Sequence, residues 1–285
     1  GIYTLSEIAE PTLEAAAQPD FKVWRRIDYG GKIRNYGLLR GASSLTSFMS
    51  LRSSTVGRFV SMAGFGYDES TTVRPPDDSA ALRAFLSVPE YYQTDDVPVP
   101  EGFVFDREEN GVAVYTNPNA VPMGFLQTTC TGTHHQRMDS ETVPTVLLAA
   151  VTLEDDALEK YGGRMAKLDV YAIPDWQESV ARLKANACDS FETSANGFTA
   201  HIDANDAGML VFTIPFDKGF SATVDGQKVE IVNCDVAFMG VFVEAGEHDI
   251  VFTYHTRGLT IGIVMSLIAA VTLIVYYTAA KRKRI

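Results

Sequence analysis

The sequence predicts an α+β protein in which a mixed helix and strand region precedes an antiparallel β-sandwich-like domain and one C-terminal transmembrane helix. Before about residue 189, several segments place their apolar residues at helical spacing. After that point the period changes to two, which is typical of strands with one buried face. The chain then carries an apolar run at 259–280 that contains no charged residue.

The order of these patterns predicts four parts. We expect a mixed α/β extracytoplasmic region at 1–110 and a β-rich extracytoplasmic domain at 111–256, sandwich-like from about 189. A transmembrane helix at 257–280 and a cytoplasmic basic tail at 281–285 follow. With 46% hydrophobic and 21% charged residues, the composition is that of a folded protein rather than a disordered one.

Helices are predicted in three places. Leu45, Phe48 and others recur at helical spacing across 43–62, and RPPDDSAALRAFLSV has prolines and a capping residue ahead of an apolar face. Asp175 and Glu178 stand at capping-box spacing before a third apolar face. The stretch YYQTDDVPVPEG is predicted to be a loop, and the start of TVLLAAVTLEDDALEKYG fits strand or helix equally well.

Short strands are predicted at GVAVYTN and MGFLQTT, and again from Phe191 onward. The later group comprises FTAHIDA, MLVFTIPF, FSATVDGQKVEIV, AFMGVFVEA and HDIVFTYH. Asp225-Gly226 between two of these runs is the pair that a type I′ hairpin favours, because both central residues take a positive φ. So many antiparallel strands in so short a stretch predict a β-sandwich or half-barrel.

The apolar run predicts a membrane span. As a helix with a rise of about 1.5 Å per residue it measures roughly 33 Å, enough to cross a bilayer. The cluster Lys281-Arg282-Lys283-Arg284 follows at once, and basic flanks stay cytoplasmic. We therefore expect the C-terminus inside and the domain before the span outside. The chain carries a net charge of −12, or −16 without those four residues, which disfavours nucleic-acid partners.

The N-terminus conflicts with that topology, because it has no basic and apolar signal region and begins with Gly1. We interpret the chain as the C-terminal part of a longer polypeptide with earlier membrane helices; a tail-anchored protein with a cytoplasmic domain is the alternative. The span itself repeats small residues every four positions, at Gly258, Gly262, Ser266 and Ala270. Such a stripe allows another helix to approach closely.

No motif of nucleophilic, metal-dependent or nucleotide-dependent catalysis is present, so we predict no catalytic residue, metal or cofactor in this chain. The pair His134-His135 lacks a third ligand at metal-binding spacing. The acidic pairs at 77–78, 95–96 and 155–156 lie beside prolines or at helix starts, where capping explains them. Cys130, Cys188 and Cys234 allow one disulfide or three inert core thiols.

Carbohydrate binding is a hypothesis that the aromatic content leaves open. Arg26, Asp28, Asn35 and Tyr36 fall together in WRRIDYGGKIRNYG. Charged and amide groups beside aromatic rings suit sugar hydroxyl groups. The same residues equally suit an internal ion pair that holds a loop.

Several stretches together resemble one bacterial family. Arg26-Ile27-Asp28, GASSLTSFMSL, VYTNPNAVPMGFL, VLLAAVTLED and the segment from Pro215 to Tyr254 running into a span occur in the order seen in the C-terminal part of YfhO-family membrane proteins. The chain departs from the family at SVPEYYQTDD and at Gly219-Phe220, where the family usually has Gly-Trp. Asn117, within the most specific motif, and Phe220 therefore join the binding candidates.

The resemblance implies a multi-span membrane protein similar to GT-C glycosyltransferases that act in the glycosylation of cell-wall polymers such as lipoteichoic acid. It implies that the catalytic acid lies on an early outside loop absent here. The partners would be the lipid bilayer, the missing membrane helices, a polyprenyl-phosphate-linked sugar and a cell-wall polymer. Two other functions remain open, namely a membrane-anchored carbohydrate- or protein-binding module and a spacer without ligand.

Overall fold

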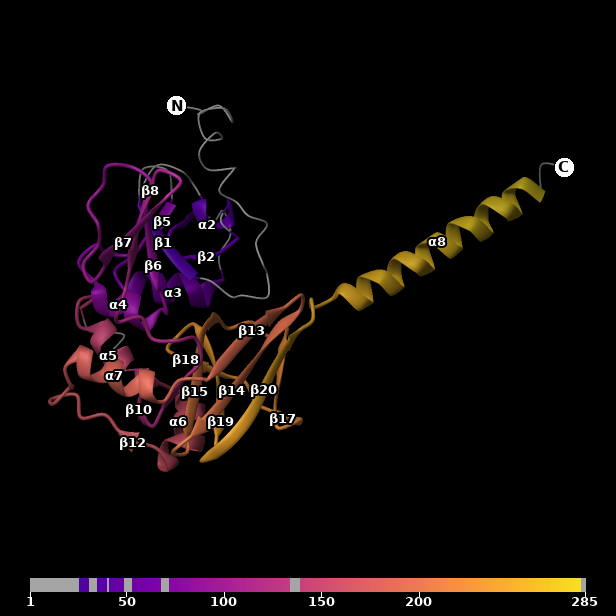
Figure 1. Ribbon diagram of the computed structural model, residues 1–285. Coiled ribbons are helices and arrows are strands. Elements are labelled where there is room, and N and C mark those ends of the chain that lie inside the picture. The colour runs from indigo at the N-terminus through magenta and orange to yellow at the C-terminus, as the bar shows by residue number, and fades with distance from the viewer. Residues whose placement is uncertain are drawn as a thin grey trace.

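The protein has a folded body from which one long helix extends, as the computed structural model in Figure 1 shows. The structure describes residues 26–30, 35–39, 41–48, 53–67, 72–133 and 139–282. Within them, helices and mostly antiparallel sheets alternate along the chain before the terminal helix. The predicted α+β class is confirmed.

A β-sandwich forms the half of the body next to the terminal helix. Its outer sheet has the strand order β13-β14-β20-β16-β17, and its inner sheet has the order β18-β19-β15-β9. The outer strands are β13 (Ser190–Ser194), β14 (Gly197–Ala204), β20 (Gly246–Tyr254), β16 (Phe220–Val224) and β17 (Gln227–Val229). The inner strands are β18 (Val232–Cys234), β19 (Phe238–Val243), β15 (Gly208–Pro215) and β9 (Phe125–Gln127).

The two sheets differ in burial because the inner one lies between two layers. In β14 buried and more exposed residues alternate, since one of its faces meets solvent. In β15 the first six residues are all buried, because both of its faces are covered. Between the sheets, the ring of Phe198 stacks on Phe252 with centroids 4.4 Å apart and lies 5.0 Å from the ring of Phe212. These aromatic contacts join the two sheets through one apolar core.

The hairpin between β16 and β17 has the turn that the sequence predicts. Asp225 has φ of 52° and Gly226 has φ of 74°, so both central residues are left-handed as a type I′ turn requires. The Asp225 backbone N–H also bonds to the carbonyl oxygen of Asp249, at 2.9 Å. The turn is thereby tied to β20, the strand that leads to the terminal helix.

A layer of helices covers the other face of the inner sheet. Phe85, Leu147 and Leu183 from three helices pack in one core with Val211 and Phe238 of the sheet. The third helix begins as predicted, because Asp175 Oδ1 accepts hydrogen bonds from the backbone N–H groups of Gln177 and Glu178. These helices are α4 (Ala80–Phe85), α5 (Val143–Ala149) and α7 (Trp176–Ala185).

Short elements complete this layer. A small parallel sheet has the order β11-β10-β12 and lies beside α6. Its strands are β10 (Thr129–Thr131), β11 (Val151–Thr152) and β12 (Ala166–Lys167), and the segments between them include α6 (Asp155–Tyr161) and the 3-10 helix η2 (Gly162–Arg164).

The N-terminal half of the body is a five-stranded mixed sheet with the order β2-β1-β6-β8-β7. Tyr29, Tyr36 and Tyr92 form its core with Ile27 and Val114. Its strands are β1 (Arg26–Gly30), β2 (Ser43–Ser44), β6 (Glu90–Gln93), β7 (Val104–Glu109) and β8 (Val112–Thr116). Nearby lie α2 (Tyr36–Leu39), α3 (Ser54–Met62), and a sheet of β3 (Ser47–Phe48), β5 (Thr72–Arg74) and β4 (Gly66–Tyr67).

Two local predictions need correction here. The stretch predicted as a loop begins with strand β6, whose Tyr91 and Tyr92 are buried between β1 and β8. In the described residues of 43–62, the helical pattern yields a helix at Ser54–Met62, whereas β2 and β3 occupy its first part. The ambiguous segment after residue 144 resolves into α5, then β11, then α6. The boundary proposed at residue 110 falls in the turn between β7 and β8.

The terminal helix α8 (Leu259–Arg282) is the one helix in the described part of the chain that is long and apolar enough to cross a membrane. Its candidate span, Leu259–Ala279, has a mean hydropathy of 2.4, and none of it is buried against the body. Strand β20 ends at Tyr254, so only four residues connect the outer sheet to α8.

Candidate functional site

Arg26 is a buried link between the N-terminal sheet and the sandwich. From β1 its guanidinium donates to Thr213 of β15, through Nη1 to Oγ1 at 2.8 Å and through Nη2 to the carbonyl oxygen at 2.8 Å. A further bond from Nη1 reaches the carbonyl oxygen of Leu86, just after α4. Burial lowers the pKa of Arg26. Its donors are used inside the protein, which favours the structural interpretation of this residue.

Asp28 forms the internal ion pair that the sequence left as an alternative. Its Oδ2 accepts from Nε of Arg83 at 3.0 Å, and its Oδ1 accepts from Thr46 Oγ1 at 2.8 Å and from the Tyr29 backbone N–H at 2.9 Å. Arg83 also donates from Nη1 to the carbonyl oxygen of Pro76. The pair therefore attaches α4 to β1.

The other binding candidates each make contacts inside the protein. Asn35, with φ of 54°, bonds through its side-chain amide to both backbone groups of Phe48. Tyr36 is fully buried, with its ring 5.4 Å from that of Tyr29. Asn117 donates to the carbonyl oxygen of Val88, and its Oδ1 accepts from the Asn119 backbone N–H. Phe220 packs in the sandwich, 4.9 Å from the ring of Tyr254.

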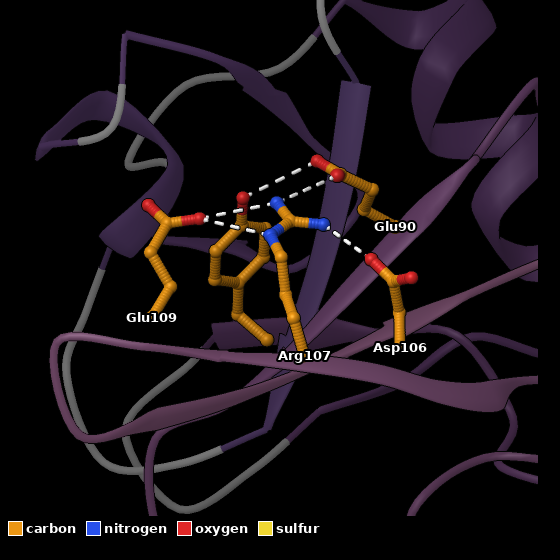
Figure 2. Close-up of polar contacts among 5 residues, drawn as sticks. Glu90, Asp106, Arg107 and Glu109 are labelled. Carbon is orange, nitrogen blue, oxygen red and sulfur yellow. Dashed lines mark hydrogen bonds and ion pairs between the residues drawn. The ribbon is translucent and has the colours of Figure 1, made fainter.

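One exposed cation is surrounded by acids on the N-terminal sheet. Figure 2 shows Arg107 of β7 between the carboxylates of Glu90, Asp106 and Glu109. A register shift between Phe105 and Arg107 leaves Asp106 as a bulge residue, and its Oδ2 lies 2.6 Å from Nη1 of Arg107. The hydrogen bond to the Asp106 carboxylate raises the pKa of Arg107. Partial burial lowers this pKa by a smaller amount. Arg107 makes four hydrogen bonds to these three carboxylates, so we assign the cluster to stabilising the edge of the sheet.

The small residues of α8 form a groove. Gly258, Gly262, Ser266 and Ala270 line it together with Arg257 and Leu259. A Cβ added at Gly262 meets no atom within 4 Å. In the described chain this stripe therefore faces open space.

A polar cavity lies where the three helices of the middle layer begin. It has a volume of about 480 Å³, which falls within the range of about 300–1,000 Å³ found for small-ligand sites. The start of α4, the start of α5 and Trp176 at the start of α7 form its walls. The lining residues are Gly64, Pro76, Asp78, Ser79, Ala80, Ala81, Glu101, Ser140, Glu141, Thr145 and Trp176.

Close contacts fix the position of the residues around this cleft. Gly64 ends the turn after α3 with φ of 72°, and a Cβ placed there would lie 2.7 Å from Cβ of Ser140. The backbone N–H of Glu101 donates to the carbonyl oxygen of Asp77 at 3.0 Å, which fixes the loop that carries the Glu101 carboxylate. Trp176 is half-buried and packs against the apolar core below the cleft.

Sequence reasoning missed this cleft. Its acids were predicted to be capping or solvated residues. Ser79 does stand at the N-cap of α4, but its side chain makes no capping hydrogen bond. The one signal available was Trp176, one of only two tryptophans, placed beside a capping aspartate. Gly64 and Trp176 are far apart in the sequence, so only the fold brings the walls of the cleft together.

Metal and thiol chemistry receive no support from the described residues. No group of three His, Cys, Asp or Glu side chains in that part of the chain is placed to hold a metal ion. His134 and His135 lie outside the described residues. Cys130, Cys188 and Cys234 are free thiols, and burial raises the pKa of Cys188 to about 12 and also raises that of Cys234.

Comparison with known proteins gives two matches. Residues 164–266 match the family model described as bacterial membrane protein YfhO, a segment that includes α7, the sandwich from β13 to β20 and the first part of α8. The uncharacterized protein YfhO of Bacillus subtilis strain 168 is 24% identical over 106 residues. That alignment covers 37% of this chain and 12% of the relative. No solved structure matches.

Proposed function

Since this chain is a YfhO-family membrane protein with one candidate C-terminal span, we propose that it is the extracytoplasmic accessory domain and last span of a multi-span glycosyltransferase. The parent protein transfers a sugar from a polyprenyl-phosphate carrier to a cell-wall polymer. Its catalytic residues lie in a part of the parent outside this chain. The domain positions the lipid-linked donor or the polymer acceptor above the membrane.

The observation that carries this proposal is the short connection between the sandwich and the span. Four residues separate β20 from α8, so a bilayer around Leu259–Ala279 lies next to the sandwich. The basic residues after Ala280 favour a cytoplasmic C-terminus, and hence a body outside the cell. A body held so close to the bilayer is well placed to contact a substrate that is anchored in the membrane by a lipid.

Cysteine labelling tests the topology. Tyr171 is 97% exposed, whereas Cys130 and Cys234 are buried and Cys188 is half-buried. We expect a membrane-impermeant maleimide to label Tyr171→Cys in intact cells and Lys283→Cys only after the membrane is permeabilised. The reverse pattern contradicts an extracytoplasmic body. The same protein without either cysteine substitution controls for labelling of the native cysteines.

Glycosylation tests the role. In a strain that lacks the gene, the intact parent protein should restore sugar on the cell-wall polymer, and a parent without residues 26–254 should not. Membrane fractionation checks that both proteins insert in equal amounts. Full glycosylation by the shortened protein overturns the accessory role.

The second candidate function is a membrane-anchored binding module without enzymatic activity. The polar cleft beside Trp176 favours this function, because a cavity of small-ligand size can bind a ligand without any catalytic residue. The groove of small residues along α8 favours the enzyme part instead, because a solitary anchor has no use for a close-packing face.

A further inference from the structure

We propose that the end of the sandwich next to α8 binds the negatively charged headgroups of the lipids that surround this helix. Three chain segments, 195–196, 216–219 and 255–258, form this end, which we call the lipid-facing end. The proposal goes beyond the proposed function, because it needs α8 to span a membrane but does not need sugar transfer.

The strand order brings the three segments to one level. In the outer sheet, β14 and β16 flank β20, the strand that leads into α8 (Figure 1). Gly197 pairs with Thr253 and Phe220 pairs with Tyr254. The β13–β14 hairpin and the β15–β16 connection therefore lie on opposite sides of β20, at the residues where this strand ends. A bilayer around Leu259–Ala279 faces both of them.

Hydrogen bonds hold these segments against the end of β20. The backbone N–H of Tyr254 donates to the carbonyl oxygen of Asn196 at 2.6 Å, and that of His255 donates to the carbonyl oxygen of Gly219 at 2.9 Å. Asp217 Oδ1 accepts from the Gly219 backbone N–H at 2.6 Å. Only three residues separate His255 from α8, so the loops stay close to the bilayer surface.

Charge differs between the two ends of the sandwich. The lipid-facing end carries the exposed cations Lys218 and Arg257, the exposed ring of His255, and one acid, Asp217. The connections at the opposite end contain three acids and no lysine or arginine. They are 205–207, 225–226 and 244–245. In a chain with a net charge of −12, these two cations thus lie where the sheet meets the lipid.

The acids of the opposite end are too distant to cancel this charge. Strand β20 has nine residues, so roughly 30 Å separates the two ends at about 3.3 Å per residue. The screening length is only about 8 Å at physiological salt. Asp235, in the β18–β19 connection at the lipid-facing end, is fully buried and does not face the lipid.

A negatively charged phosphate headgroup is the ligand that these side chains suit. Lysine offers a compact charge and arginine a planar pair of donors, and both bind phosphate oxygens. Each such cation close to an anionic lipid surface strengthens the attraction. The half-buried ring of Tyr254 lies 4.9 Å from that of Phe220, and tyrosine is enriched at headgroup level. Contacts on both sides of β20 hold the body in one orientation above the bilayer.

Hydrogen exchange locates the contact. The full chain is placed in two nanodiscs, one of phosphatidylcholine and one of equal parts phosphatidylcholine and phosphatidylglycerol. We expect the backbone amides of 216–219 and 255–257 to exchange several-fold more slowly in the disc that contains phosphatidylglycerol. Peptides that cover 225–226 and 244–245 should exchange equally in both discs. Inorganic phosphate added to the phosphatidylcholine disc should not reproduce the slower exchange, because it is not held at the membrane surface.

Charge variants separate recognition from proximity. Lys218→Gln should remove a large part of the slowing by phosphatidylglycerol, and Lys218→Gln combined with Arg257→Gln should remove all of it. The matched control is Lys228→Gln, which removes an exposed lysine of β17 at the opposite end of the same sandwich. This control should leave the slowing unchanged. Thermal unfolding verifies that the variants fold equally well.

Three results overturn the proposal. Equal exchange in the two discs shows that the lipid charge is not recognised. Slowing that persists in the double variant comes from the surface potential alone, because an anionic surface lowers the local hydroxide concentration without these cations. Protection that appears only in the intact parent protein, equally in both lipids, assigns this end to another part of the parent.

Failure of the proposed function has a different signature. If the parent without residues 26–254 still glycosylates the polymer while phosphatidylglycerol slows exchange as expected, the accessory role is wrong and the headgroup contact stands. If the parent needs this region but exchange is equal in the two discs, only the headgroup contact fails.

Discussion

Arg83 and Asp28 form a buried ion pair, with Nε 3.0 Å from Oδ2 and side chains that are 1% and 2% exposed. The pair joins α4, which forms one wall of the cleft, to β1 in the N-terminal sheet. Because both charges are out of water, the pair acts as a positional link whose partners depend on each other.

Replacing one partner should therefore be costly. We expect Arg83→Met to lower the free energy of unfolding by about 3–5 kcal/mol, because it leaves the Asp28 carboxylate buried without its cation. Arg83→Met combined with Asp28→Asn should recover a large part of that loss. Denaturant unfolding of the full chain in detergent, followed by circular dichroism, measures the two single variants and the double variant. A double variant that loses the sum of the two single losses contradicts the idea of a coupled pair.

Arg107 provides the exposed counterpart. Its side chain is 39% exposed and contacts three carboxylates, so solvent screens its interactions. We expect Arg107→Gln to cost only about 0–1 kcal/mol, with a smaller effect at high salt. The same unfolding measurement at low and high ionic strength checks this. A loss as large as that of Arg83→Met would show that the cluster is shielded from solvent far more than its exposure indicates.

Asp235 should make stability depend on pH. It is fully buried next to Cys234, its Oδ1 accepts from the Thr152 backbone N–H at 2.7 Å, and burial raises its pKa to about 7. A group whose pKa is raised in the folded state contributes stability below its unfolded pKa, and that contribution is lost as the pH rises through the folded value. Stability should thus fall between about pH 4 and pH 7, by up to ~4 kcal/mol at about 1.4 kcal/mol per pKa unit.

Asp235→Asn removes this titration. The amide keeps an oxygen for the Thr152 N–H, and asparagine tolerates the positive φ of 51° at this position. We expect the variant to be more stable than the unsubstituted chain at pH 8. Its unfolding temperature should also depend less on pH. An unchanged slope between pH 4 and pH 7 would mean that Asp235 does not titrate in that window.

Gly197 should tolerate no side chain. A Cβ at this position would lie 1.9 Å from the carbonyl oxygen of Phe252 on the neighbouring strand β20, and a backbone atom in a sheet cannot move away cheaply. We expect Gly197→Ala to destabilise the sandwich by about 1–3 kcal/mol. Gly57→Ala is the control, because Gly57 lies inside α3 with no atom within 4 Å of its added Cβ. It should raise stability by about 0.5–1 kcal/mol.

The sandwich was predictable because its outer strands face water on one side. Residues of β14 alternate between core and solvent, so their period of two is visible in the sequence. The strands β1 and β6 were missed for the opposite reason. Arg26 and Asp28 place charges inside β1, and β6 begins a segment rich in acids and prolines. Their partners are set by tertiary pairing, which local patterns do not contain.

The cleft was unpredictable for a related reason. Its acids have ordinary local explanations, and the segment from Asp78 to Glu101 reaches Trp176 only through the packing of α4 and α7 on one sheet. By contrast, the span needs no tertiary information. Its length, its lack of charge and its basic flank all lie within one continuous stretch.

The small-residue stripe of α8 gives the last prediction. An α-helix turns about 100° per residue, so Thr260 lies on the side of α8 opposite to Gly262 at nearly the same depth. A Cβ at Gly262 meets no atom of the described residues within 4 Å, so we expect harm from Gly262→Leu to come from contact with another helix. We expect that variant to lower glycosylation by the parent protein, and Thr260→Leu to leave it unchanged. Western blots of membrane fractions control for protein level, and equal behaviour of the two variants would mean that α8 is a plain anchor.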